Sequence, residues 1–360
     1  MSDAVTMNLR GVVLHGRDLE PRHGTVHLED GRIAGIDETG DPSDVPDHVV
    51  MPALVNAHSH VGDAVAMEAG RGLSLDDRVA PPDGLKHRLL READRDEQIA
   101  AMHTVLARMQ RTGVAATVDY REGGREGVEH LRAAADGLAI DAVAFGRGPS
   151  EVLDVADGYG ASGSRDDIFD EQRAAARERE KPFGIHAGER DGDDVDGALA
   201  LEPDHLVHMV HARDEDLDWL AERAGTADEV PVAVCPRSNM VTDVGLPPVE
   251  ALHDVTSVAL GTDNAMLVAP NLWREMAFVS LYYDVPDEAV LAMATRHGRA
   301  IAGMEGGVIE EGAPADLVVL HREGALAGVD DPVAGVVRRA GPSDVERVIL
   351  GGETVYERPS

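Results

Sequence analysis

The sequence contains very little cysteine, aromatic residue or continuous apolar chain. Cys235 is the only cysteine among 360 residues, so no intramolecular disulfide can form and a reducing compartment suits the chain. No apolar run approaches the ~18 residues of a membrane span, and Met1–Arg10 holds no apolar signal core. These absences argue against a disulfide-stabilised secreted protein and against a membrane protein. We expect a soluble, cytoplasmic protein.

Basic residues are scarce, and nearly all of them are arginine. Lysine occurs only at Lys86 and Lys181, and 33 Lys+Arg stand against 67 Asp+Glu, which gives a formal net charge of −34. A surface this acidic repels phosphate backbones, so nucleic acid is not an expected partner. Excess acid, scarce lysine and 3% aromatic residues are typical of proteins adapted to high salt. We therefore predict a halophilic protein that loses stability at low ionic strength.

The order of the apolar segments predicts an α/β protein with two domains. Strand patterns dominate residues 1–50 and return after Gly303, whereas short apolar strands alternate with amphipathic helices in between. We predict a (β/α)8 TIM barrel at 51–304 and a small β-sandwich domain made from 1–50 plus 305–360. A length of 360 residues suits a barrel of ~250 residues with an accessory domain.

Eight barrel strands are predicted, at 53–60, 115–119, 140–145, 152–156, 182–186, 205–210, 230–234 and 257–260. Helices are expected at 94–111, 126–135, 165–180 (capped by Ser164 or Asp166), 195–201, 215–224, 249–253, 271–282 and 286–302. A Pro81-Pro82 break interrupts the long connection after the first strand. Strands of the terminal domain are expected at 11–14, 24–28, 32–36, 307–309, 315–320, 345–351 and 354–356.

Side chains that can bind a metal stand at the expected C-terminal ends of strands, the edge where barrels carry their chemistry. His58 and His60 are one residue apart on the first strand, so their side chains share a face. His186 ends the fifth strand, His208 or His211 lies at the end of the sixth, and Asp263 follows the eighth. Three imidazoles and one carboxylate suit zinc or iron(II) and leave a position for water.

Several motifs resemble the amidohydrolase superfamily. Met51–His60 resembles its first-strand signature, Ile185–Glu189 its His-x-x-Glu motif, and Leu260–Asn264 its eighth strand. Val207–His211 and the Pro-x-Ser-Asn turn in Cys235–Asn239 are similar to the metal-dependent aminohydrolases. This narrower group includes guanine, cytosine and S-adenosylhomocysteine/methylthioadenosine deaminases and the triazine chlorohydrolases.

The resemblance implies one divalent metal ion, with zinc expected and iron(II) or manganese(II) as alternatives. The implied ligands are His58, His60, His186 and Asp263. Glu189 would protonate the substrate ring, and His208 would stabilise the new oxygen on the attacked carbon. Asp263 would accept the proton of the attacking water.

The chain departs from these relatives in two ways. Many of them have histidine where this chain has Val234, a difference that concerns substrate handling rather than metal binding. Binuclear members carry a carbamylated lysine on the fourth strand, where neither Lys86 nor Lys181 falls, so we expect one metal. The candidate substrate-binding residues, all just beyond strand ends, are Glu68, Arg71, Arg121, Arg147 and Arg237.

The expected activity is hydrolytic deamination of an aminated heterocycle such as a purine, pyrimidine, pterin or triazine. An alternative is hydrolysis of a cyclic amide or another C–N bond, as in imidazolonepropionase- or dihydroorotase-like relatives. A catalytically silent, ligand-binding barrel is a third hypothesis, which the complete ligand set disfavours. Glu189 favours deamination, because a proton donor to a ring nitrogen suits amidine-like substrates. The expected partner is a small molecule, and a homodimer stays an open alternative.

Overall fold

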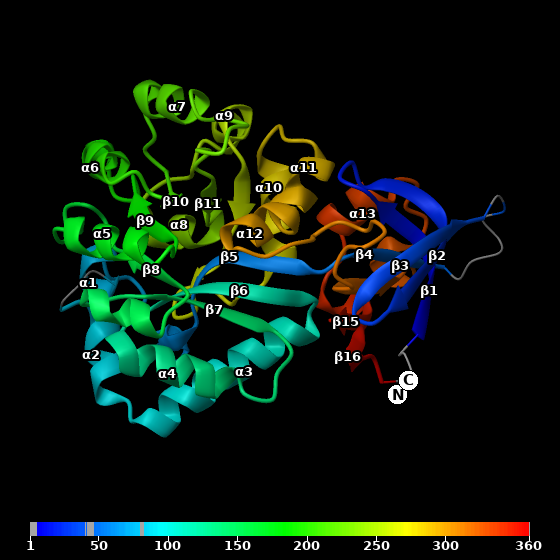
Figure 1. The fold of residues 1–360 in the computed structure, drawn as a ribbon, viewed down its shortest axis with the longest axis horizontal. Coiled ribbons are helices and arrows are strands. Elements are labelled where there is room, and N and C mark those ends of the chain that lie inside the picture. Colours follow the sequence, from blue (N-terminus) through cyan, green and yellow to red (C-terminus); the bar gives the residue numbers. More distant parts are fainter. Residues whose placement is uncertain (1–5, 40, 42–46, 80–82, 360) are drawn as a thin grey trace.

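Two sheets organise the molecule (Figure 1). The computed structural model describes residues 6–39, 41, 47–79 and 83–359, so the predicted Pro81-Pro82 break lies outside the described residues. One sheet has nine parallel strands, and the other has seven strands from the two ends of the chain. No helix within the described ranges is long and apolar enough to cross a membrane.

The nine-stranded sheet forms the barrel. Its strands are β5 (Leu54–His60), β6 (Val114–Arg121), β7 (Asp141–Gly146), β8 (Gly158–Ala161), β9 (Phe183–Ala187), β10 (His205–His208), β11 (Val232–Val234), β12 (Val258–Leu260) and β13 (Asp263–Asn264). β12 and β13 are two segments of the eighth strand. β12 pairs with β11, and β13 pairs with β5, where Asp263 stands opposite Ser59. These two pairings close the ring, and the predicted (β/α)8 barrel is confirmed.

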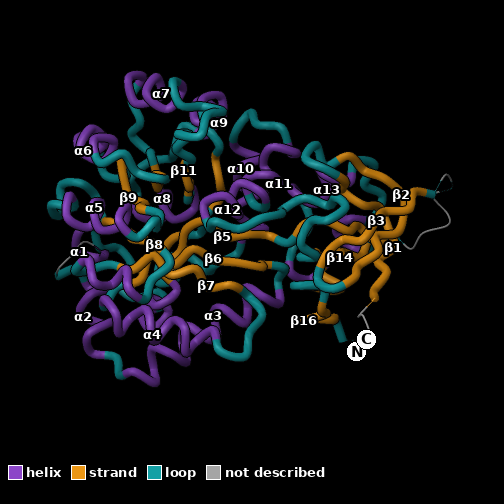
Figure 2. The backbone as a smooth tube through the Cα atoms, in the orientation of Figure 1, coloured by secondary structure: helices purple, strands orange, loops and turns teal. Residues whose placement is uncertain are grey.

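Helices pack around the barrel (Figure 2). They are α1 (Leu75–Val79), α2 (Leu85–Glu92), α3 (Arg95–Arg111), α4 (Gly124–Ala135), α5 (Asp170–Glu178), α6 (Val195–Ala200), α7 (Asp214–Ala221), α8 (Pro236–Thr242), α9 (Val249–Val255), α10 (Leu272–Tyr282), α11 (Asp287–Met293) and α12 (Arg296–Ile301). Short 3-10 helices are η2 (Val61–Ala66), η3 (Ser150–Asp154) and η4 (Gly192–Asp194). The capping box of Asp94 and Glu97 starts α3, which buries Met102 and Leu106.

The ends of the chain share the second sheet. Its order is β16 (Glu353–Glu357), β15 (Val345–Leu350), β14 (Leu317–His321), β4 (His48–Pro52), β1 (Thr6–His15), β2 (Glu20–Glu29) and β3 (Arg32–Glu38). Strand β4 pairs with β1 on one side and β14 on the other, so it joins the two terminal segments. The predicted sheet from both termini is confirmed, whereas the domain bounds at 51 and 304 and the sandwich form stay predictions. This part also holds η5 (Gly324–Leu326), α13 (Pro332–Arg338) and η6 (Pro342–Asp344).

The predicted fourth strand at 152–156 is wrong. Those residues fall mainly in η3, where Val152 and Leu153 are buried, and the fourth strand is β8. β8 contains Gly158 and Gly160, residues that strands normally avoid. A Cβ at Gly160 would lie 2.5 Å from Cδ1 of Tyr120, so glycine is required there by packing rather than by strand propensity.

Other boundaries also need correction. The helix predicted at 165–180 is α5, which begins only at Asp170, with Phe169 rather than Ser164 or Asp166 at its N-cap. The single helix predicted at 286–302 is two helices, α11 and α12. Residues 307–309 form no strand. The expected Pro-x-Ser-Asn turn is the start of α8.

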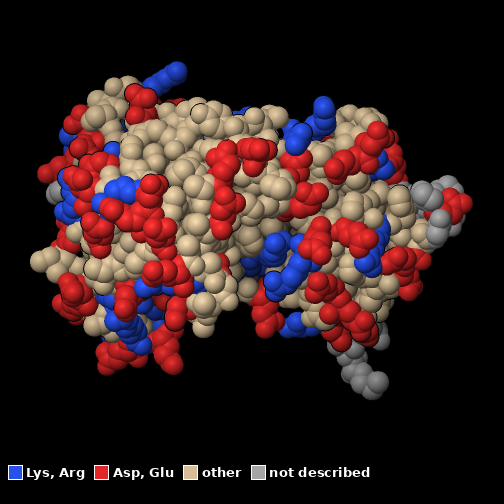
Figure 3. Space-filling view, turned by 90° about the horizontal axis from the view of Figure 1, so that it is seen from above, with Lys and Arg blue, Asp and Glu red and all other residues tan. Residues whose placement is uncertain are grey.

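Charged side chains of opposite sign are distributed differently over the surface. Asp and Glu are spread widely over the face shown in Figure 3, whereas Lys and Arg gather in smaller groups. Acidic residues therefore stand beside one another across both the barrel and the terminal sheet.

Candidate active site and metal centre

Five buried side chains meet at the C-terminal edge of the barrel. Two triads have ligand atoms that all lie within 4.8 Å of one another: His58, His60 and His186, and His58, His208 and Asp263. Oδ1 of Asp263 lies 3.4 Å from Nε2 of His58 and 3.6 Å from Nε2 of His60. The structure therefore brings the four predicted ligands together, with His208 beside them.

The histidines have the hydrogen-bonding pattern of metal ligands. Nδ1 of His60 donates to the Tyr120 carbonyl at 3.0 Å, and Nδ1 of His186 donates to the Ala161 carbonyl at 2.8 Å. Each ring thus keeps the lone pair of its Nε2. Both ring nitrogens of His58 are buried without a hydrogen-bond partner among the described residues.

Burial keeps these rings neutral, which is the form that binds a metal. It lowers the pKa of His58 to about 4 and the pKa of His60 to about 3. The pKa of His186 is also far below its usual value, because of burial and then the nearby Arg147 guanidinium. Neutral imidazoles, a carboxylate and the unpartnered nitrogens of His58 fit a divalent cation.

Local sequence features bring the first and eighth strands together at the site. The side-chain amide of Asn56 donates to Oγ1 of Thr262 at 2.8 Å, and its Oδ1 accepts from the Thr262 backbone N–H at 3.0 Å. A Cβ at Gly261 would lie 2.8 Å from Cβ of His58, so glycine permits this close approach. Asp263 and His208 have positive φ values of 55° and 77°, a strained conformation for residues with side chains.

The first turn of α8 orients two functional groups. Ser238 Oγ donates to Oδ2 of Asp263 at 2.5 Å. The Asn239 amide nitrogen lies 3.1 Å from Nδ1 of His208 and, as a donor, makes Nδ1 the acceptor. The hydrogen of the His208 ring is then on Nε2, which lies 3.7 Å from Oε2 of Glu189. Burial raises the pKa of Glu189 above the usual value.

These groups open into one cavity. Its lining consists of His60, Leu75, Val79, Lys86, Arg147, Ser162, Gly163, Asp166, His186, Glu189, Arg190, His208, Asp263, Asn264 and Leu267. The predicted proton donor Glu189 and the predicted oxygen-stabilising His208 therefore share the cavity with metal-competent residues. Among the five candidate substrate-binding residues, only Arg147 belongs to this lining.

The other four candidates lie elsewhere. Glu68 and Arg71 are exposed on the connection after η2. Arg121 is buried against Glu122, with 3.1 Å between Nη2 and Oε2. Arg237 pairs with the fully buried Glu275 at 3.0 Å, and burial raises the pKa of that carboxyl to about 7. The geometry gives these four residues no place in the lining.

The lysine at position 86 is the main group that sequence reasoning missed. Lys86 comes from α2, is 3% exposed and lines the cavity. Its Nζ lies 2.9 Å from Oδ2 of Asp63 and 2.6 Å from Oε1 of Glu122. The signal present in the sequence is rarity, because lysine occurs at only two positions of the chain.

The sequence matches one family over most of its length. The model of the amidohydrolase family matches residues 49–355, which include the barrel and part of the terminal sheet. The chain therefore belongs to the amidohydrolase family. It is a hydrolase that acts on carbon–nitrogen bonds.

Curated relatives agree with this assignment. A protein named putative aminohydrolase from Methanothermobacter thermautotrophicus is 35% identical and is aligned over 96% of this chain and 97% of its own length. A protein named 5-methylthioadenosine/S-adenosylhomocysteine deaminase from Halobacterium salinarum is 30% identical, over 99% of this chain and 93% of its own.

Solved structures share the fold at lower identity. Atrazine chlorohydrolase from Arthrobacter aurescens, complexed with zinc, has a TM-score of 0.78 at 18% identity and covers 97% of this chain and 95% of its own. An adenosine deaminase from Xanthomonas campestris with bound zinc has a TM-score of 0.73 at 17% identity and covers 96% and 92%. This chain therefore shares its fold with these two proteins.

Proposed function

We propose that this protein releases ammonia from an aminated heterocycle by hydrolysis, with the residues named above as its active site. The observation that carries the proposal is the cluster of His58, His60, His186 and Asp263, of which the last three line one cavity with Glu189 and His208. Relatives named aminohydrolase and deaminase over nearly the whole chain support the same reaction class.

His58, His60, His186 and Asp263 would hold a single divalent cation, for which we propose zinc because two solved neighbours contain it. Such a cation lowers the pKa of water from 15.7 toward ~7 and so supplies hydroxide at neutral pH. Both lysines are already engaged, Lys86 by carboxylates and Lys181 by the carbonyl oxygens of Leu153 and Ala156. Neither is placed to bridge two metals, which favours one ion.

Two carboxyl groups would move the protons. Asp263 would accept the proton of the attacking water on Oδ1, while Ser238 holds its other oxygen at 2.5 Å. Glu189 would protonate a ring nitrogen, which makes the adjacent carbon more electrophilic. Its enclosed position on the cavity wall favours the protonated carboxyl that this role needs.

His208 would stabilise the oxygen that forms on the attacked carbon. With Asn239 donating to Nδ1, its Nε2–H is free to donate toward the cavity. A single donor of this kind contributes roughly 3–4 kcal/mol to the transition state. Collapse of the tetrahedral carbon, with the proton passed from Asp263 to the leaving nitrogen, would release ammonia.

Hydrolysis of a cyclic amide is the second candidate, because the same metal-competent residues could serve it. Glu189 separates the two reactions. A carboxyl that delivers a proton to a ring nitrogen assists attack on an amidine-like carbon, whereas an amide carbonyl is activated mainly at its oxygen. Oε2 of Glu189 lies 3.7 Å from Nε2 of His208 on the cavity lining, so a proton donor for a ring nitrogen is present, and this favours deamination.

The test is ammonia release by zinc-loaded protein in molar salt across purines, pyrimidines, pterins and triazines. His58→Ala, which removes an expected ligand, is the blank, and bound metal is quantified in both proteins. We expect about one metal per wild-type chain and release from one chemical class. Absence of release across the panel with the metal still bound would move the assignment to cyclic amides.

A further inference from the structure

Three cations in the cavity lining have no role in the mechanism above. Arg190 pairs with the exposed Asp76 at 2.8 Å, whereas Lys86 and Arg147 share a carboxylate. Lys86 reaches the wall from α2, and Arg147 reaches it from the end of β7. Both are close to Oε1 of Glu122, at 2.6 Å for Lys86 Nζ and 3.1 Å for Arg147 Nη1. One carboxylate oxygen thus holds two cationic side chains side by side at the cavity.

Lys86 retains one unused donor. Its ammonium has three N–H groups and lies at ion-pair distance from two carboxylates, 2.9 Å from Oδ2 of Asp63 and 2.6 Å from Oε1 of Glu122. Burial alone would lower the pKa of Lys86, but the charges of Asp63 and Glu122 outweigh burial and raise it. The side chain is therefore a charged ammonium with one hydrogen left for a ligand.

Arg147 retains donors at Nη2. Its Nε donates to the Gly160 carbonyl at 3.1 Å, and Nη1 donates to Glu122. Nη2 lies 3.2 Å from Nδ1 of His186. That nitrogen gives its own hydrogen to the Ala161 carbonyl and cannot accept a second one, so Nη2 has no hydrogen-bond acceptor among the described residues.

The carboxylates that neutralise these cations are not part of the cavity lining. Asp63 and Glu122 contact Lys86 but are absent from the described lining of the cavity, as is Asp119, which contacts Arg121 at 3.7 Å. Lys86 and Arg147 thus present the positive side of this neutral cluster to a cavity whose lining also contains the carboxyl groups of Asp166, Glu189 and Asp263. A ligand atom that meets both Lys86 and Arg147 there must be an acceptor, and a negative oxygen satisfies both.

We propose that Lys86 and Arg147 bind an acidic oxygen group, a carboxylate or a phosphate, carried by the substrate. The proposal deepens the deamination assignment and rests on it, because it names the substrate class as an aminated heterocycle with an acidic substituent. It also explains why a lysine is kept at this position in a chain that otherwise uses arginine almost throughout.

Binding of product-like probes tests this proposal without turnover. The probes are uracil against uracil-5-carboxylate, and inosine against inosine 5′-monophosphate, none of which has an amino group to release. Calorimetry on the zinc-loaded protein should show that one acid binds about tenfold or more tightly than its neutral partner, the scale of one charged hydrogen bond. The pair that shows the preference identifies the acid as carboxylate or phosphate.

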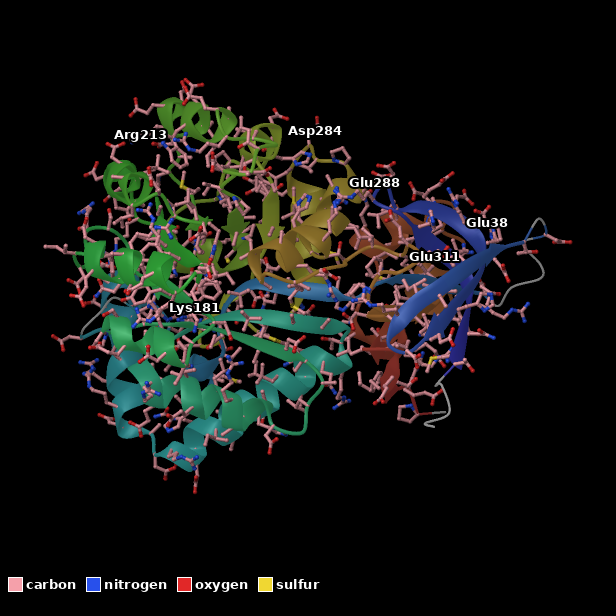
Figure 4. All side chains as sticks on the ribbon, viewed as in Figure 1. Glu38, Lys181, Arg213, Asp284, Glu288 and Glu311 are labelled. Carbon is pink, nitrogen blue, oxygen red and sulfur yellow. The ribbon has the colours of Figure 1, made fainter. Side chains whose placement is uncertain are left out.

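Two variants test whether Lys86 and Arg147 cause the tighter binding of the acidic probe. Lys86→Met combined with Asp63→Asn removes the ammonium and the charge of Asp63, while Glu122 keeps its ion pairs with Arg121 and Arg147. Arg147→Met removes the second cation. In each variant, the dissociation constant of the neutral probe divided by that of the acidic probe should fall toward one. The control is Lys181→Met, at the other lysine (labelled in Figure 4), whose Nζ binds only backbone carbonyls; it should keep the wild-type ratio.

Several results would overturn the proposal. These are equal binding of acid and neutral probe to the wild type, no binding of either acid at millimolar concentration, or an unchanged ratio in both cavity variants. Melting curves confirm that each variant is folded before its ratio is compared. Failure of the deamination proposal can be distinguished from failure of the acid-binding proposal. In the first case ammonia release would be absent while the acidic probe still bound more tightly than the neutral one.

Discussion

The mouth of the barrel and the terminal sheet are built on opposite principles. The sheet interior is aliphatic, with Leu9, Val26, Leu317 and Ile349 among its buried residues. The barrel mouth instead buries imidazoles and carboxylates, and both ring nitrogens of His58 have no hydrogen-bond partner among the described residues. Buried apolar area stabilises a fold, whereas buried polar groups without partners cost free energy. The comparison indicates that the sheet contributes stability and the mouth contributes chemistry.

The two regions are nevertheless continuous in the chain. Strand β4 lies in the terminal sheet between β1 and β14, and after Ala53 the chain enters β5, which carries His58 and His60. Ala53 itself is tied by its N–H to the carbonyl of Asp316 at 2.9 Å. The sheet therefore anchors the strand that carries two expected metal ligands.

The largest expected effect is on chemistry at the mouth. Glu189→Gln keeps the shape of the side chain and removes its acidic proton, so we expect turnover to fall by about 10²–10⁴-fold. Metal content and the melting temperature should change little, because Glu189 is outside the expected ligand set. Steady-state ammonia release and metal analysis measure both quantities.

A matched control is Glu129→Gln, an exposed position on α4 that is remote from the cavity lining. It should leave turnover unchanged. Wild-type turnover in Glu189→Gln would remove this carboxyl from the mechanism, and loss of metal would show that it supports the ligands instead.

The effect of intermediate size is a loss of stability caused by a substitution in the terminal sheet. It should leave the chemistry at the barrel mouth unchanged. Leu317 is fully buried in β14, so Leu317→Ala removes packed methyl groups and leaves a cavity. We expect a loss of about 2–5 kcal/mol in the free energy of unfolding. Turnover and metal content per folded molecule should stay at wild-type values, as measured by denaturant titration and by assays well below the transition. A parallel loss of turnover would show that the two regions do not act independently.

The sequence alone predicts groups that lie at strand ends better than groups that meet through tertiary contacts. His58, His60, His186 and Asp263 were predicted because alternating strands direct them to one edge. The contact between Lys86 and Glu122 joins residues 36 positions apart, from a helix and a loop, and no local period indicates it.

Arginines illustrate the same limit. Arg147 and Arg237 both stand just past a strand, yet one lines the cavity and the other pairs with Glu275 on α10. Position relative to a strand end does not decide this outcome. Both arginines pair with a carboxylate, Arg147 with Glu122 and Arg237 with Glu275, so the outcome depends on where that carboxylate lies. The carboxylate of Glu275 comes from a helix 38 residues later in the chain.

The smallest expected effect involves the whole surface and does not distinguish the two regions. A formal net charge of −34 makes the folded chain repel itself, and acidic side chains cover both parts of the face in Figure 3. The screening length falls from about 10 Å at 0.1 M salt to about 3 Å at 1 M. We therefore expect the melting temperature to be several degrees higher in molar KCl than in dilute buffer, for wild type and Leu317→Ala alike. Calorimetry with metal analysis at both salt levels separates screening from metal loss. Equal midpoints would contradict the prediction, and a shift confined to the metal-loaded protein would assign the salt effect to the barrel mouth instead of the surface.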